Sequence, residues 1–104
     1  MELTLKNEHC AVIVTDAGAM LRSLVRDGRE YLWQGDPAYW AGQAPVCFPI
    51  VGVLPKGAST AFGKPCRMKR HGVARINPFT LTEHPVSYTH LRAPETLSDL
   101  VCRL

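Results

Sequence analysis

Short alternating and β-branched segments dominate the start of the chain. Residues 2–6 alternate polar and apolar side chains, and residues 10–15 form a run rich in β-branched residues. Both patterns are typical of strands, because successive side chains of a strand point to opposite faces. Residues 20–26 and 29–33 flank Asp27-Gly28, a dipeptide that suits the two positive-φ positions of a tight hairpin. The pattern therefore predicts strands joined by tight turns.

Proline and glycine punctuate the middle of the chain. Asp36-Pro37 is expected to open a short helical turn through Trp40, because aspartate caps helices and proline suits the first helical position. Residues 43–57 are too apolar for a free linker, but their three prolines forbid a regular central strand. This stretch is expected to form a packed, irregular crossing segment.

Strand patterns return after the crossing segment. A second hairpin is predicted between residues 59–62 and 66–68, with Gly63-Lys64 as its turn, and residues 79–83 predict one more strand. The sequence shows neither a long helical periodicity nor an internal repeat. The predicted fold class is all-β, built of antiparallel strands and hairpins.

Composition and charge describe an ordinary globular domain. With 104 residues, 46% of them hydrophobic and 20% charged, the chain suits one domain and is not expected to be disordered. The net charge of +3 is too small to demand a polyanionic partner. No run approaches the roughly 18 apolar residues of a membrane span, and the first residues lack the features of an export signal. A cytoplasmic location without membrane attachment is expected.

The four cysteines favour neither a metal site nor a disulfide framework. Their positions, 10, 47, 66 and 102, include no pair at C-x-x-C spacing, and no histidine stands at zinc-finger spacing from such a pair. Disulfides would need an oxidising compartment, so free thiols and no metal are expected.

The end of the chain differs from the rest. The string VSYTHLRAPETLSDLVCRL at residues 86–104 resembles an in-frame translation of a sequencing adapter, with a variable index at residues 96–99. Taken at face value, residues 95–104 would form a short helix instead. The resemblance to an adapter implies that residues 86–104 are non-native, and that residues 1–85 are a partial domain.

The stretch MKRHGVAR at residues 68–75 holds the first candidate site. His71 stands among cationic residues and precedes Gly72, which would let the backbone approach a ligand closely. His71 would be either a polar group in a substrate cleft or a histidine on a solvated loop. The residues alone favour the loop.

Basic residues gather in the same part of the chain. No acidic residue interrupts the stretch between Asp36 and Glu83, which contains six cations: Lys56, Lys64, Arg67, Lys69, Arg70 and Arg75. A nucleic-acid surface would interleave stacking aromatic side chains, but Phe62 is the only aromatic residue among these cations, and no nucleic-acid-binding signature appears. A solvated face, or one completed by acids elsewhere in the protein, is expected.

Aromatic and acidic residues complete the candidates. Trp33, Tyr39 and Trp40 form a cluster that suits either the apolar face of a sugar ring or packing in the core. The carboxylates, Glu30 among them, show no pair spaced for acid–base chemistry. By themselves, these residues predict no more than a β-rich domain with a polar cleft.

Three stretches stand in a fixed order along the chain. They are EYLWQGDPAYW at residues 30–40, APVCFPIVG at residues 44–52, and MKRHGVAR at residues 68–75 with Phe79. Together they resemble the galactose mutarotase-like, aldose 1-epimerase family, in particular its LacX-like branch. The resemblance begins at residue 1 and ends near residue 84. It implies the N-terminal portion of a β-supersandwich, in which large antiparallel sheets stack face to face and a sugar binds in an open cleft.

The same resemblance implies substrate-binding residues. His71 and Arg75 look like ligands of sugar hydroxyl groups, and Gly72 would keep the backbone near them. Trp40 is added from the aromatic cluster, by its residue type, as a candidate for contact with the sugar. Val53 stands where the family often has an arginine, so one substrate contact differs here.

The implied activity is the interconversion of α and β anomers of an aldohexose or a hexose phosphate. A carboxylate base and a histidine acid would open and reclose the ring, without a metal or other cofactor. Both catalytic groups of the family fall beyond Pro85, so this chain alone is expected to be inactive. The alternatives are a non-enzymatic carbohydrate-binding module on the same fold and a small basic nucleic-acid-binding β-domain.

Overall fold

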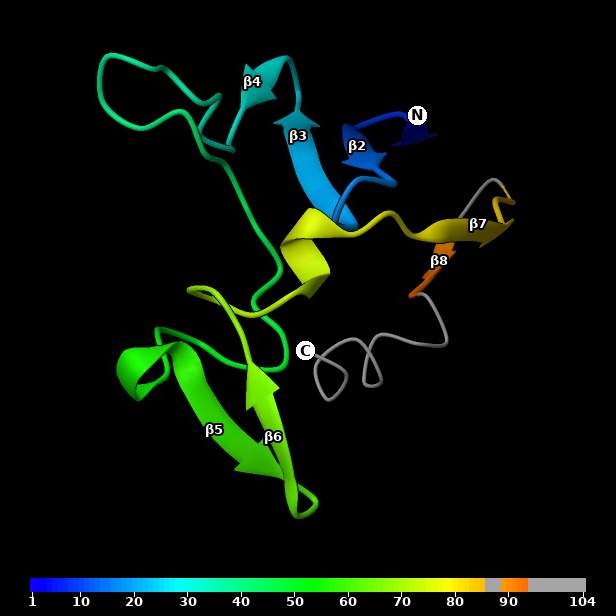
Figure 1. Cartoon of the computed structure of the whole chain (residues 1–104). Coiled ribbons are helices and arrows are strands. Elements are labelled where there is room, and N and C mark those ends of the chain that lie inside the picture. The colour runs from blue at the N-terminus through cyan, green and yellow to red at the C-terminus, as the bar shows by residue number, and fades with distance from the viewer. Residues whose placement is uncertain (86–88, 94–104) are drawn as a thin grey trace.

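The computed structural model describes residues 1–85 and 89–93, and that part of the chain contains strands and 3₁₀ turns but no α-helix (Figure 1). Its elements are β1 (Glu2–Lys6), β2 (Cys10–Thr15), β3 (Met20–Arg26), β4 (Arg29–Glu30), the 3₁₀ turn η1 (Pro55–Gly57), β5 (Ala58–Ala61), β6 (Lys64–Arg67), the 3₁₀ turn η2 (Ala74–Ile76), β7 (Thr80–Glu83) and β8 (His90–Arg92). The predicted all-β class is confirmed. In the described residues, no helix is long and apolar enough to cross a membrane.

The first four strands form one antiparallel sheet in the order β1-β2-β3-β4. The predicted turn at Asp27-Gly28 is confirmed, since both residues have positive φ, 47° and 80°. The strand predicted at residues 29–33 is too long, because β4 ends at Glu30. The side chain of Glu30 explains the difference, because its Oε1 accepts the N–H groups of Leu24 and Leu32. The Leu24 N–H group is then no longer available to pair with a residue of β4.

The second sheet is the β5–β6 hairpin, and its predicted turn is wrong by one residue. The two positive-φ positions belong to Phe62 and Gly63, with φ of 52° and 74°, whereas Lys64 already pairs with Ala61 in the ladder. Glycine occupies the second position of this turn, and phenylalanine takes the left-handed conformation at the first.

The third sheet pairs β7 with β8, where Leu81 faces Leu91. Strand β8 falls within residues 86–104, for which a non-native origin stays a prediction. The short helix considered for residues 95–104 lies outside the described residues.

The crossing segment is irregular, as predicted. Residues 43–57 contain no strand, and the segment is tied to the rest of the chain by isolated bridges from Ala44 to Leu21 and from Phe48 to Gly72. The predicted helical turn at Asp36 is also confirmed, because Trp40 N–H donates to the Asp36 carbonyl oxygen at 2.8 Å.

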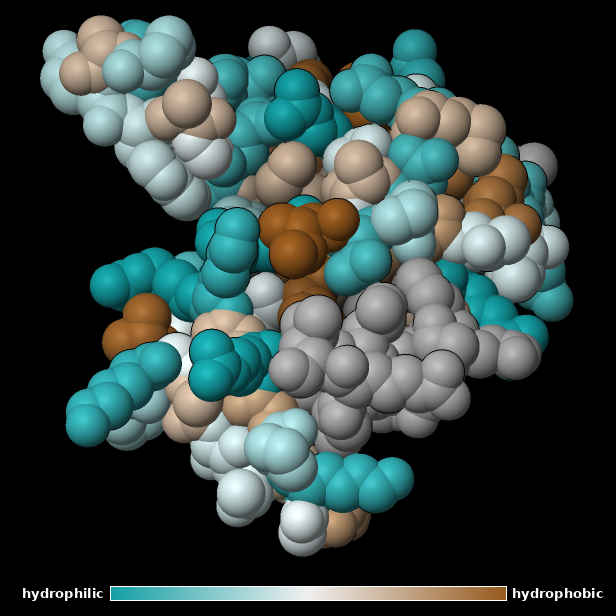
Figure 2. Space-filling view, viewed as in Figure 1, coloured by the Kyte–Doolittle hydropathy of each residue, from teal (hydrophilic) through white to brown (hydrophobic). Residues whose placement is uncertain are grey.

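The hydrophobic core of the described residues is small. Cys66, Val73 and Ala74 form its buried cluster, against which Met68 and Phe79 pack. Many large apolar side chains stay exposed, and Figure 2 shows apolar and hydrophilic side chains interleaved on one face. Exposed fractions reach 82% for Val51 and 59% for Val53. The chain therefore presents uncovered apolar surface, part of it on the crossing segment.

Candidate functional site

The site begins with a tight turn between Lys69 and Gly72. Gly72 N–H donates to the Lys69 carbonyl oxygen at 3.1 Å, and His71 occupies the third position of this turn with φ of +66°. Glycine is preferred at that position, since the left-handed conformation costs other residues about 1–2 kcal/mol. Strong local contacts must therefore hold His71 in place.

Those contacts come from the crossing segment. His71 N–H donates to the Gly52 carbonyl oxygen at 2.7 Å, and Gly52 N–H donates to His71 Nδ1 at 2.9 Å. Phe48 N–H donates to the His71 carbonyl oxygen at 3.2 Å. The two backbone groups and one ring nitrogen of His71 are thus engaged, and the half-buried ring has a fixed orientation.

Gly72 allows the close approach between these two segments. A Cβ atom at Gly72 would overlap the Phe48 carbonyl group, and Gly72 has φ of +77°. The Phe48 carbonyl oxygen accepts the N–H groups of Val73 at 2.8 Å and Ala74 at 3.2 Å. The proposed role of Gly72 near a ligand stays a prediction, while its contact with Phe48 gives it a role in packing.

Arg75 lies in η2, which stands between the first sheet and the β5–β6 hairpin (Figure 1). Its backbone packs closely against Gly18, since a Cβ atom added to Gly18 would lie only 2.8 Å from the Arg75 carbonyl oxygen. Asn77 Nδ2 donates to the Val73 carbonyl oxygen at 2.7 Å and closes the turn. The Arg75 side chain is exposed and forms no ion pair within the described residues. His71 and Arg75 therefore lie on two successive, well-anchored turns of the chain.

Among the described residues, the contacts of Trp40 lie within its own loop. Trp33 Nε1 donates to the Trp40 carbonyl oxygen at 2.8 Å, and the rings of Trp33 and Tyr39 meet edge to face at 6.2 Å. Trp40 packs against Gly42, so the aromatic residues form a cluster within their own loop. None of the contacts seen within the described residues joins Trp40 to His71 or Arg75.

The crossing segment also carries Val53, which directly follows the glycine that binds the His71 ring. Its side chain is 59% exposed. The side chain of an arginine at this position would therefore extend from the residue next to Gly52, beside the anchored turn.

Two carboxylates have structural partners. Glu30 accepts hydrogen bonds from the Ser23 hydroxyl and from the N–H groups of Leu24 and Leu32, which lower the pKa of its carboxyl group. The N-terminal ammonium group donates to Asp16 Oδ1 at 2.8 Å, and this hydrogen bond lowers the pKa of Asp16. Both groups are held as carboxylates and suit stabilisation of the fold better than proton transfer near neutral pH.

The six basic residues between Asp36 and Glu83 are exposed, and none forms an ion pair within the described part of the chain. No group of three or more His, Cys, Asp or Glu side chains in that part could hold a metal ion.

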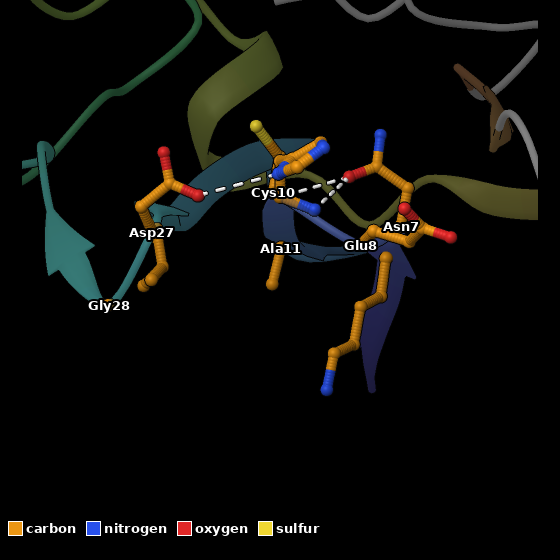
Figure 3. Close-up of a pocket in the computed structure, with 9 residues that line it drawn as sticks. Asn7, Glu8, Cys10, Ala11, Asp27 and Gly28 are labelled. Carbon is orange, nitrogen blue, oxygen red and sulfur yellow. Dashed lines mark hydrogen bonds and ion pairs between the residues drawn. The ribbon is translucent and has the colours of Figure 1, made fainter.

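A separate hollow of about 230 Å³ lies between the β1–β2 and β3–β4 turns (Figure 3). Asn7 Oδ1 accepts the N–H groups of His9 and Cys10 at 2.9 and 2.7 Å, and His9 Nδ1 lies 3.5 Å from Asp27 Oδ1. The side chains of His9 and Asp27 are 72% and 65% exposed. These contacts hold the turns together, and the hollow contains none of the predicted site residues.

The link between Gly52 and His71 is the part of the site that sequence patterns missed. It joins residues 19 positions apart through a backbone N–H group, which no residue type reveals. The only signal was the glycine itself, at the end of the FPIVG stretch.

Comparisons with known proteins give this geometry a context. The family model described as aldose 1-epimerase matches residues 1–99. The plasmid-encoded protein LacX of Lactococcus lactis subsp. lactis is 43% identical over 91 residues, which are 80% of this chain and 30% of that protein. The chain thus spans less than a third of the length of this curated relative.

Solved structures agree with the family match. A galactose mutarotase related enzyme from Lactobacillus acidophilus superposes with a TM-score of 0.83 at 31% identity, covering 96% of this chain and 35% of that one. A galactose mutarotase-like protein from Lactobacillus casei superposes with a TM-score of 0.88 at 28% identity, covering 98% of this chain and 35% of that one. The strands described above are therefore part of a galactose mutarotase-like fold, and the chain belongs to the aldose 1-epimerase family, with similarity to its LacX proteins.

Proposed function

We propose that residues 1–85 form one wall of the sugar site of an aldose 1-epimerase, an isomerase that interconverts α and β anomers of an aldohexose or a hexose phosphate. The observation that carries this proposal is the pair of anchored turns that holds His71 and Arg75 in a member of that family. The ring of His71 is oriented by the crossing segment, and the guanidinium group of Arg75 is exposed. Both groups can donate hydrogen bonds to sugar oxygen atoms.

Anomer exchange needs two proton transfers. A base removes the proton of the anomeric hydroxyl group while an acid protonates the ring oxygen, and each positioned group typically contributes about 10²–10⁴-fold. Glu30 and Asp16 are engaged in structural hydrogen bonds, so we assign neither of them as the base. The proposal places the acid and the base in the part of the family fold that this chain does not span, and the 104-residue chain alone is inactive.

The six exposed cations bear on the choice of substrate. Their side chains form no ion pairs within the described residues, so they could neutralise a phosphate group on the sugar. This supports a hexose phosphate beside a free aldohexose as the substrate.

A chimera tests the proposed function. Residues 1–85 are joined to the remaining sequence of Lactococcus lactis LacX, and polarimetry follows the mutarotation of fresh α-glucose and of a hexose phosphate. We expect the chimera to exceed the buffer rate, His71→Ala and Arg75→Ala to reduce its kcat/KM about tenfold or more, and His9→Ala, a matched exposed histidine, to leave it unchanged.

Two outcomes would contradict the proposal. Sugar binding by a folded chimera without any acceleration would instead favour a non-enzymatic carbohydrate-binding module. Acceleration by the 104-residue chain alone would show that the acid and the base lie within it.

A further inference from the structure

We infer that Gly52 is a positioning residue, whose backbone N–H fixes His71 as the Nε2–H tautomer and thereby makes it a hydrogen-bond donor to the ligand. That the ligand is a sugar rests on the proposed function, whereas the tautomer follows from the geometry of the two residues.

The hydrogen bond between Gly52 and the ring of His71 can run in only one direction. Gly52 N–H lies 2.9 Å from His71 Nδ1, measured between the two nitrogen atoms. A backbone N–H group can only donate, so Nδ1 must present its lone pair to it. In a neutral imidazole ring one nitrogen carries the proton, and here that nitrogen is Nε2.

Gly52 and His71 are joined by two hydrogen bonds. Gly52 donates to the ring of His71 and accepts the His71 backbone N–H at 2.7 Å, so both of its backbone groups serve the same partner. Gly52 has φ of +88° and His71 has φ of +66°. An added Cβ atom at Gly52 would meet no other atom within 4 Å, so glycine is favoured here by its backbone conformation and not by a lack of space.

The other ring nitrogen of His71, Nε2, is available to a ligand. Nε2 has no hydrogen-bond partner within the described residues, and the ring is only half-buried. A neutral Nε2–H group donates to an oxygen atom and has no lone pair with which to accept a proton. His71 in this state is therefore suited to bind a hydroxyl or ring oxygen of the ligand, and unsuited to act as a base through Nε2.

Nitrogen NMR tests the tautomer on the uniformly ¹⁵N-labelled 104-residue chain without ligand. At a pH where the ring resonances are those of neutral imidazole, we expect His71 to show the Nε2–H pattern in long-range ¹H–¹⁵N correlations. A ¹⁵N–¹⁵N coupling across the hydrogen bond should also connect the Gly52 amide with Nδ1. His9 is exposed, and no N–H group of the described residues donates to its ring, so it should show no such coupling. A neutral His71 ring protonated at Nδ1, or lacking the coupling, would overturn the inference.

A pair of glycine variants separates positioning from general strain. Gly52→Ala and Gly63→Ala both place a side chain at positive φ in open space, but only Gly52 contacts His71. We expect Gly52→Ala to move the His71 ring resonances toward a mixture of tautomers, and Gly63→Ala to leave them unchanged. Equal responses to the two substitutions would argue against a positioning role. The spectrum of the unsubstituted chain decides the tautomer even if Gly52→Ala does not fold.

Titration of the labelled chimera with an aldose distinguishes this inference from the proposed function. A shift of the His71 Nε2 resonance supports the sugar site. An Nε2–H tautomer that ignores the sugar would retain the inference and count against the proposed function. A sugar-dependent shift in a ring protonated at Nδ1 would overturn the inference and support the proposed function.

Discussion

Gly18 and Arg75 meet backbone to backbone, at a distance that leaves no room for a side chain on Gly18. A Cβ atom there would lie 2.8 Å from the Arg75 carbonyl oxygen, and Gly18 has φ of +70°. The turn between β2 and β3 thus supports the turn that carries Arg75.

Gly18→Ala should therefore cost more stability than an alanine placed at a similar φ in open space. Gly28 has φ of +80° and no atom within 4 Å of an added Cβ atom, which makes Gly28→Ala the matched control. We expect Gly28→Ala to lower the free energy of unfolding by about 1 kcal/mol and Gly18→Ala by about 3 kcal/mol, because the second adds a steric overlap to the backbone strain. Urea unfolding followed by tryptophan fluorescence measures both, and equal losses would contradict the contact.

Glu30→Gln should lower the melting temperature of the chain. The Glu30 carboxylate accepts hydrogen bonds from the Ser23 hydroxyl and from two backbone N–H groups, and a glutamine would lose the negative charge that strengthens all three. Glu8→Gln, on the exposed β1–β2 turn, is the control and should have little effect. Similar melting temperatures for the two variants would show that the Glu30 contacts contribute little.

Acid should destabilise the chain through Asp16 and Glu30. Hydrogen bonds lower the pKa of each carboxyl group in the folded chain, that of Asp16 through the N-terminal ammonium group and that of Glu30 through Ser23 first. Such a group adds stability that is fully present above its unfolded-state pKa, about 4 for both types, and that is lost as the pH falls through the lower folded-state value.

The N-terminal pair allows a specific check of this acid dependence. Acetylation of the N-terminus and Asp16→Asn each remove one partner of the same ion pair. Each change should therefore weaken the pH dependence of the free energy of unfolding between about pH 2 and pH 6 by a similar amount. The two changes together should weaken it little more. Fully additive effects would mean that the two groups do not interact.

Val53→Arg should be tolerated and should favour a phosphorylated substrate in the chimera. Val53 is 59% exposed, so the substitution should change the free energy of unfolding by no more than about 0.5 kcal/mol. An arginine next to Gly52 adds a cation beside the anchored turn, and we expect a lower KM for the hexose phosphate. Val51→Arg, at a position that is 82% exposed, is the control. An identical change in KM for both variants would point to general electrostatic attraction instead.

Local patterns predicted the strands well because their causes are local. The hairpin at Asp27-Gly28 follows from two residues that tolerate positive φ, and both have it. The second turn was misplaced because phenylalanine gives no signal for positive φ, although Phe62 adopts φ of 52°. The length of β4 depended on the carboxylate of Glu30, which captures a backbone N–H group that a longer ladder would use.

The roles of the candidate site residues stay predictions, and the backbone contacts that build the site could not be predicted from residue types. His71 and Arg75 were proposed from a motif, and the structure places them on two successive turns, each held by backbone contacts. Trp40 was proposed from its residue type, yet its contacts lie within its own loop. The links from Gly52 to His71 and from Gly18 to Arg75 cross long sequence separations and involve backbone atoms, so no pattern of residue types could have revealed them.

The strained turn and the exposed crossing segment depend on each other. The hydrogen bonds that keep His71 at positive φ come from a segment whose side chains Val51 and Val53 face solvent. Val51 and Val53 flank Gly52, so a protein surface that covers both valines would restrict the backbone that binds the ring of His71. Association with that surface and ligand binding at the turn would then be thermodynamically coupled, with each strengthening the other by the same factor.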